Sequence, residues 1–259
     1  MAHYLFRLIS FLSYWLEAVD EHSLHSPFFY DLYTRHIKPV ASPGQFATIE
    51  GLRAKLLRDH HTITVHDLGA KAKHKAVRKI SRIAATSLSA PRYSMIFYRI
   101  ATACNATYIV ELGTSFGINT LYLAAIEKSV VTTFEAAPAV ADIAAATVES
   151  AGSNNIQLVI GDIDKTLPEF LSDVRRVDFA FVDANHHYEP TVRYFEWLLK
   201  KTHEKSAVVV DDIHYSPEME RAWLTIRNHR LVYGSADLFR CGILFFDPSL
   251  NKQHVILQV

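Results

Sequence analysis

The sequence predicts an α/β fold in which a doubly wound, mostly parallel sheet of seven strands ends in an antiparallel hairpin and follows a helical extension. From Thr107 onward, apolar runs alternate with helical stretches, and strands that are apolar throughout belong to parallel sheets covered on both faces. After residue 228, β-rich runs follow one another without room for helices, which requires an antiparallel pairing. Residues 1–100 show helical periodicity instead.

The chain length fits this organisation. Its 259 residues accommodate an N-terminal helical extension, expected at 1–100, and one sheet domain, expected at 101–259. The expected β-rich runs are 108–112, 130–134, 156–160, 177–182, 207–210, 231–235, 242–246 and 254–258. The expected helices of the sheet domain are 118–127, 139–150, 167–172, 190–201 and 217–228.

The charge balance argues against a nucleic-acid partner. Lys+Arg and Asp+Glu both total 27, so no net field attracts nucleic acid or an anionic membrane. A local basic stretch comprises Lys71, Lys73, Lys75, Arg78, Lys79 and Arg82. Lys71, Lys75, Arg78 and Arg82 are expected to share a solvated helical face. Nucleic-acid binding is therefore not expected.

Cysteine usage and the N-terminus together predict a cytoplasmic protein. Cys104 and Cys241 are too few for a disulfide framework and form no metal-spaced cluster, which indicates a reducing compartment. The apolar N-terminal stretch has no basic segment and no cleavage site, and Arg7 and Glu17 interrupt it. Neither export nor a membrane span is expected.

A stripe of apolar residues marks the first helix. They recur at spacings of three and four: Leu5, Leu8, Ile9, Leu12, Trp15, Leu16 and Val19. The stripe is expected to dock on the chain's own domain or on a second subunit, which would give a homodimer. A membrane-surface helix is the weaker alternative, because the polar face is not rich in Lys or Arg.

The strongest functional signal is a strand, a turn and a helix across residues 109–118. Gly113 and Gly117 follow the strand that holds Glu111, and glycines at a strand's carboxyl end let the backbone approach a ligand closely. Glu135 ends the next strand, where a carboxylate can accept ribose hydroxyls. Asp162 follows the third strand and either faces an adenine amino group or caps a helix.

This pattern resembles the Glu/Asp-x-Gly-x-Gly-x-Gly motif of class I methyltransferases, which use S-adenosyl-L-methionine (SAM), with Ser115 at the central glycine. The resemblance runs from Thr107 over nearly all of the remaining chain. It implies the methyltransferase variant of the Rossmann-like fold, whose terminal hairpin is not expected in a dehydrogenase domain. It also implies that SAM is bound by Glu111, Gly113, Thr114, Ser115, Gly117, Glu135, Asp162 and Asp183.

Three aspartates follow the fourth and fifth predicted strands. Asp183 ends one strand and Asp211 and Asp212 end the next, and such turns converge on one edge of a parallel sheet. Crowded carboxylates repel one another unless protons or a cation relieve them. Mg²⁺ prefers oxygen ligands of this kind. The sequence therefore predicts a metal site of Asp183, Asp211 and Asp212.

This arrangement resembles the catechol-type O-methyltransferases, in which an Asp and an Asp-Asn pair hold Mg²⁺; here Asp212 replaces the asparagine. Residues 183–188 resemble still more closely the Asp-Gly-x-His-x-Tyr string of a bacterial group. The resemblance implies metal-assisted O-methylation of a small-molecule hydroxyl, with Asp183 and His186 as catalytic residues. His186 replaces a lysine base of the catechol type, and it can serve as base, metal ligand or structural donor.

Other functions stay open at this stage. Without a metal, Asp183 and His186 can act as simple acid–base groups, and N-methylation becomes available. A nucleotide-dependent oxidoreductase shares the early glycines and Glu135, and a non-catalytic SAM-binding protein needs no aspartate cluster. No motif identifies the acceptor, because acceptor pockets come from variable loops and the N-terminal extension.

Overall fold

The computed structural model describes residues 2–39, 44–66 and 75–259. The chain divides into two compact units: unit 1 comprises Met1–Pro39 and Arg175–Val259, and unit 2 comprises Val40–Val174. This division does not test the domain boundary expected between residues 100 and 101, which stays a prediction. Within the described ranges, no helix combines the length and hydropathy needed to cross a bilayer.

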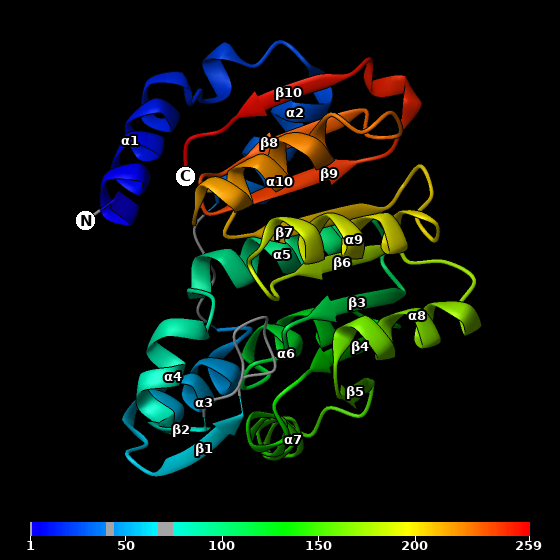
Figure 1. Ribbon diagram of the computed structural model, residues 1–259. Helices are drawn as coiled ribbons and strands as arrows, with labels where there is room; N and C mark the ends of the chain where they lie inside the picture. The colour runs from blue at the N-terminus through cyan, green and yellow to red at the C-terminus, as the bar shows by residue number, and fades with distance from the viewer. Residues whose placement is uncertain (1, 40–43, 67–74) are drawn as a thin grey trace. The chain divides into compact units, whose positions relative to one another are not determined.

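Unit 2 holds three parallel strands with β4 in the middle: β3 (Tyr108–Leu112), β4 (Val130–Glu135) and β5 (Ile156–Ile160). A helix follows each strand, namely α6 (Ile118–Ala124), α7 (Pro138–Ala151) and α8 (Ile163–Asp173) (Figure 1). In the strand register Leu112 lies opposite Phe134, and Glu135 lies opposite Ile160. The three turns that follow the strands therefore open at the same edge of this sheet.

The rest of unit 2 departs from the expected helical extension. It contains α3 (Ala47–Arg58), β1 (Thr62–His66), β2 (Lys75–Lys79), α4 (Ile80–Ser87) and α5 (Pro91–Ala103), and the two strands form an antiparallel hairpin. The helical prediction was wrong for Lys75–Lys79, because pairing with a strand rich in β-branched residues outweighs helical spacing. Lys71 and Lys73 lie outside the described residues.

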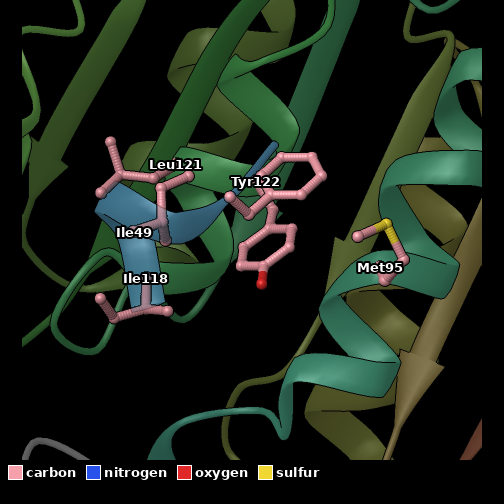
Figure 2. Close-up of a cluster of buried hydrophobic side chains, with 6 residues drawn as sticks. Ile49, Met95, Ile118, Leu121 and Tyr122 are labelled. Atoms are coloured by element: carbon pink, nitrogen blue, oxygen red, sulfur yellow. The ribbon is translucent and has the colours of Figure 1, made fainter. Parts of the chain in front are cut away.

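A buried cluster ties α3 and α5 to α6 (Figure 2). The rings of Phe46 and Tyr122 stack with centroids 4.3 Å apart. The Tyr122 hydroxyl donates to Glu50 Oε1 at 2.8 Å. Ile118, the first residue of α6, belongs to the same cluster. The N-terminal part of unit 2 therefore fixes the helix that starts directly after the glycine turn.

Unit 1 holds five strands in the order β6-β7-β9-β8-β10, with bounds β6 (Phe179–Val182), β7 (Ala207–Asp211), β8 (Gly234–Asp237), β9 (Cys241–Phe245) and β10 (Gln253–Ile256). Strand β9 is antiparallel to both β7 and β8, so the predicted terminal hairpin is confirmed. Strand β10 pairs in parallel with β8 at the edge. Apart from the β1–β2 hairpin, the described chain thus has five strands in unit 1 and three in unit 2, eight in all rather than the seven expected.

The helices of unit 1 come from both ends of the chain. The N-terminal segment provides α1 (Ala2–Glu17), η1 (Glu21–Ser23), α2 (Pro27–Asp31) and a π-helical turn, η2 (Leu32–Ile37). The C-terminal segment provides α9 (Tyr188–Leu199), α10 (Pro217–Arg227) and η3 (Pro248–Leu250). Figure 1 shows α9 and α10 on the same face of these strands. Ser216 caps α10 by accepting from the Met219 N–H.

Replacing Gly242 by alanine is expected to destabilise the fold. Gly242 lies in β9 against Trp223 of α10, whose side chain is buried. An added Cβ would lie 2.4 Å from two atoms of that ring, so the indole has to shift within a close-packed core. We expect Gly242→Ala to lower the free energy of unfolding by about 3 kcal/mol, measured by urea denaturation.

Gly51→Ala provides the matched control. Gly51 lies inside α3, and a methyl group added there would have no atom within 4 Å, so alanine should raise stability by roughly 0.5–1 kcal/mol. If both substitutions changed the free energy of unfolding by the same amount, the steric explanation would be contradicted.

Candidate functional site

The turn after β3 has a left-handed backbone at three alternate positions. The φ angles are 99° at Gly113, 48° at Ser115 and 79° at Gly117. Glycine adopts such angles without steric cost, whereas Ser115 is held there at a cost in strain. Gly117 is also the N-cap of α6. The predicted motif thus forms a tight strand-to-helix turn with its backbone open to close approach.

Glu135 closes this turn from the neighbouring strand. Its two carboxylate oxygens accept from the Ser115 and Ala137 N–H groups, each at 3.0 Å. The Gly113 and Thr114 N–H groups both donate to the Phe134 carbonyl. Burial raises the pKa of the Glu135 carboxyl, and the hydrogen bonds from the Ser115 and Ala137 N–H groups oppose the rise. The structure therefore brings the glycine turn and Glu135 together, as the sequence predicted.

Glu111 lies beneath the turn. Its fully buried carboxylate accepts from Asn119 Nδ2 at 2.9 Å, and from the Thr120 and Thr133 hydroxyls at 2.5 and 2.7 Å. Burial raises the pKa of the Glu111 carboxyl, and the hydroxyl and amide donors oppose the rise. These bonds hold the start of α6 against β3 and β4. Glu111 thus supports the turn from within, and its direct contact with a cofactor stays a prediction.

The other predicted cofactor residues of unit 2 have local partners. Asp162 is the N-cap of α8, and its side chain accepts from the Asp164 N–H at 3.0 Å. The capping alternative is therefore realised, and the adenine contact stays a prediction. The Thr114 hydroxyl bonds that of Thr133 at 2.6 Å. The Ser115 hydroxyl bonds that of Ser87 at 2.7 Å, at the end of α4.

In unit 1, the turns after β6 and β7 bring Asp183, His186 and Asp212 together; we call them the Asp–His–Asp cluster. Each offers one ligand atom within 4.8 Å of the others. His186 Nε2 lies 3.6 Å from Asp183 Oδ1, and His186 Nδ1 lies 3.8 Å from Asp212 Oδ2. The φ angles of His186 and Asp212 are 42° and 55°. Strained backbone of this kind is concentrated at functional sites.

Asp211 does not belong to this cluster. It is fully buried, and its carboxylate accepts from Arg240 Nε at 3.1 Å and from Arg240 Nη2 at 2.9 Å. Asp211 is the last residue of β7, whereas Asp212 lies in the turn after it with a left-handed backbone, and its carboxylate lies 3.8 Å from His186. Burial raises the pKa of Asp211, and the Arg240 guanidinium opposes the rise. The structure therefore brings two of the three predicted aspartates together with His186, whereas Asp211 lies against Arg240; the predicted metal role of the three aspartates stays a prediction.

The donor chemistry of the Asp–His–Asp cluster fits a divalent cation. Two carboxylates and one imidazole offer the oxygen and nitrogen ligands that such ions take in proteins. Asp211 is instead compensated by Arg240, a residue that sequence reasoning missed. A single arginine in a hairpin turn carries no motif that could have indicated this pairing.

A hollow of about 490 Å³ adjoins the cluster within unit 1. It is lined by His3, Asn185, His186, His187, Tyr215, Ser216 and Glu218. The ring centroids of His186 and Tyr215 are 6.0 Å apart, and His187 Nδ1 lies 2.8 Å from Glu218 Oε2. The volume lies within the usual range for a small-molecule site, roughly 300–1,000 Å³. His3 and Tyr215 were not predicted, because neither falls in a recognisable motif.

The parallel strands with a terminal antiparallel hairpin, and a glycine turn bonded to the acid of the next strand, define the fold of class I methyltransferases. A family model described as a methyltransferase domain matches residues 110–213. That segment carries the glycine turn, Glu135 and the whole Asp–His–Asp cluster.

Solved structures show the same fold. An O-methyltransferase of Bacillus cereus was solved with S-adenosylhomocysteine (SAH). It aligns with a TM-score of 0.57 at 18% identity, covering 83% of this chain and 96% of that one. An O-methyltransferase of Streptomyces achromogenes, solved with SAM, aligns with a TM-score of 0.55 at 19% identity, covering 62% and 82%. The predicted class of fold is therefore confirmed.

Two catechol O-methyltransferases are similar in sequence. That of Mycobacterium tuberculosis is 30% identical over 117 residues, which is 44% of this chain and 51% of that protein. That of Niastella koreensis is 28% identical over 127 residues, or 48% and 57%. The match spans about half the length of each relative. The resemblance to O-methyltransferases seen in the motifs is confirmed, whereas the roles of single residues stay predictions.

Proposed function

We propose that the protein is a SAM-dependent methyltransferase that O-methylates a small-molecule hydroxyl. One observation carries this proposal: the stretch that matches a methyltransferase domain, 110–213, includes both the glycine turn bonded to Glu135 and the Asp–His–Asp cluster. The glycine turn with Glu135 suits the nucleoside part of SAM, and the Asp–His–Asp cluster suits a hydroxyl that loses its proton. The similarity to catechol O-methyltransferases supports oxygen rather than nitrogen as the acceptor atom.

The proposed SAM site is the turn from Gly113 to Gly117 together with Glu135. The Glu135 carboxylate accepts from the Ser115 N–H of the turn, which supports its proposed role as the acceptor of ribose hydroxyls. Asp162, Thr114 and Asp183 complete the proposed set, with Glu111 supporting the turn from below. When bound, SAM supplies a methyl group on a positively charged sulfur. The protein then has to orient the acceptor, accept its proton and exclude water.

The proposed catalytic residues are Asp183 and His186. His186 lies between two carboxylates, at 3.6 Å from Asp183 and 3.8 Å from Asp212. An imidazole that takes a hydroxyl proton becomes a cation, and adjacent carboxylates stabilise that charge. A bound divalent ion, Mg²⁺ in the proposal, would be held by Asp183 and Asp212 and would lower the pKa of the hydroxyl. His186 then serves as a third ligand or as the base.

Turnover of a defined acceptor tests this function. Full-length protein incubated with SAM and a panel of catechols and other phenols should form methyl ethers and S-adenosylhomocysteine, measured by mass spectrometry. We expect EDTA to lower the rate at least about tenfold and added Mg²⁺ to restore it, because the metal activates the hydroxyl. N-methylated products alone would overturn the acceptor assignment. A methylation rate that EDTA does not change would overturn only the proposed role of the metal.

The proposed partners follow from the same reasoning. The acceptor is a small molecule, nucleic acid is not expected, and self-association occurs through α1. The cytoplasm is the proposed location, because the two cysteines form no disulfide in the described chain and SAM is an intracellular metabolite.

A further inference from the structure

Helix α1 exposes a large apolar face. Eight bulky apolar side chains on this one helix are between 43% and 78% exposed: Tyr4, Leu5, Leu8, Ile9, Phe11, Leu12, Trp15 and Leu16. We call this set the apolar face of α1. The opposite side contacts unit 1, where the Tyr14 hydroxyl donates to the Leu257 carbonyl and the Ser10 hydroxyl donates to Glu220. Of the predicted stripe, Val19 pairs with the C-terminal segment, the other residues are exposed and do not dock on the chain's own domain, and docking on a second subunit stays a prediction.

The exposed area is large enough for a stable interface. From the exposed fractions, these side chains leave on the order of 900 Å² accessible, similar to the roughly 800 Å² that each partner contributes to a standard protein–protein interface. Contiguous apolar patches of this size are rare on monomers and mark interaction surfaces.

The positions in the apolar face are symmetric about Ser10. Tyr4 mirrors Leu16, Leu5 mirrors Trp15, Leu8 mirrors Leu12, and Ile9 mirrors Phe11. In an antiparallel pair of identical helices with a two-fold axis at the level of Ser10, each of these residues meets its mirror position on the other copy. A two-fold interface requires such self-complementarity.

The charges of α1 favour a protein partner over a lipid surface. Besides His3, the only acidic or basic residues of α1 are Arg7 and Glu17, which carry opposite charges, and none of the three belongs to the apolar face. Helices that lie on anionic membranes carry many Lys and Arg residues on the polar face. An uncharged, self-complementary face fits a second copy of the same chain.

We infer that the protein is a homodimer joined by an antiparallel pair of α1 helices, and that this pairing fixes one wall of the acceptor hollow. His3 of α1 lines that hollow, and its ring meets Tyr215 edge to face with centroids 5.0 Å apart. The Arg7 guanidinium lies 5.9 Å from the same tyrosine ring. The second part of the inference rests on the proposed function, whereas the first does not.

Charge reversal at the centre of the helix pair tests the dimer. Leu8 and Leu12 lie nearest the two-fold axis, each facing the other residue on the second copy. We expect the wild type at about 50 µM to show twice the 29.3 kDa chain mass by light scattering. The Leu8→Glu, Leu12→Glu double variant and the Leu8→Lys, Leu12→Lys double variant should each be monomeric. Their equimolar mixture should recover the doubled mass, because opposite charges then meet.

The control is Leu57→Glu, at a leucine of α3 that is 42% exposed, against 55% for Leu8 and 48% for Leu12, and it should leave the doubled mass unchanged. Circular dichroism identifies any variant that fails to fold, and recovery of the dimer in the mixture is evidence that both variants fold. A monomeric wild type at 50 µM would overturn the inference. If that monomer also co-sediments with phosphatidylcholine–phosphatidylglycerol vesicles, the apolar face of α1 binds a lipid surface instead of a second copy.

Kinetics test the link between the dimer and the hollow. The monomeric variants should show an acceptor KM raised at least about fivefold and an unchanged dissociation constant for SAM, because the hollow loses support while unit 2 is untouched. The mixed dimer should recover the wild-type KM. Monomers with a normal acceptor KM would overturn the link and leave the dimer standing, and absence of any turnover in the wild type would instead count against the proposed function.

Discussion

Glu135→Ala is expected to weaken SAM binding at least 100-fold, measured by isothermal titration calorimetry. The carboxylate accepts from the Ser115 and Ala137 N–H groups and is proposed to accept ribose hydroxyls as well. Its removal leaves those donors unmatched and frees the turn that shapes the site. Hydrogen bonds to charged groups contribute about 1.5–3 kcal/mol each, so loss of two of them is sufficient. Glu149→Ala, an exposed acid at the end of α7, is the control and should bind normally.

The pH dependence of SAM affinity should follow from the same residue. Burial raises the pKa of Glu135, so its carboxylate takes up a proton at a higher pH than an exposed glutamate does. The ionised form is the stronger acceptor, and affinity should therefore fall as pH decreases through this raised pKa. Glu135→Gln should bind more weakly at neutral pH and lose this dependence. Wild-type affinity that rises on acidification would contradict the assigned role.

Asp183→Asn should reduce kcat for the acceptor about 10²- to 10⁴-fold. The substitution keeps the shape of the side chain and removes the charge that lies 3.6 Å from His186. An imidazolium at His186 then loses one of its two carboxylate partners, and a metal loses a ligand. SAM affinity should change less than kcat, because Asp183 is only one member of the proposed SAM site and the substitution leaves the glycine turn and Glu135 intact.

Glu204→Gln, an exposed acid of unit 1 outside the hollow, provides the comparison for the loss of one charge. Its kcat should match the wild type. A fall in kcat of less than about threefold for Asp183→Asn would show that the Asp–His–Asp cluster is not the centre of the reaction.

Strands such as β6 and β7 could be predicted because they are fully buried and read as apolar runs. The β1–β2 hairpin was missed because its residues Lys75–Lys79 also fit a helical spacing, and only the partner strand decides between the two. Pairing partners are set by tertiary structure, which local periodicity does not contain.

The candidate site was predictable to the level of the turns and less so for single side chains. Glycine spacing fixes a backbone conformation, so the approach of Gly113 and Ser115 to Glu135 followed from the motif. The partner of Asp211 did not, because Arg240 comes from the distant β8–β9 turn. Asp211 ends β7 and is buried against Arg240, whereas Asp212 lies in the left-handed turn that follows and joins the cluster.

The exposure of α1 shows a further limit of periodicity. Spacings of three and four predict that one side of a helix seeks apolar contact, yet they do not identify what it contacts. In this chain the side with Ser10 and Tyr14 contacts the rest of unit 1, and the apolar face of α1 is exposed.

The most direct test of the central claim is calorimetric titration of the unmodified full-length protein with SAM, with NAD⁺ as the comparison ligand. We predict one SAM bound per chain with a dissociation constant in the micromolar range, near −8 kcal/mol, and no heat from NAD⁺. Binding of NAD⁺ but not SAM, or of neither, would contradict the assignment of the glycine turn and Glu135 as a SAM site.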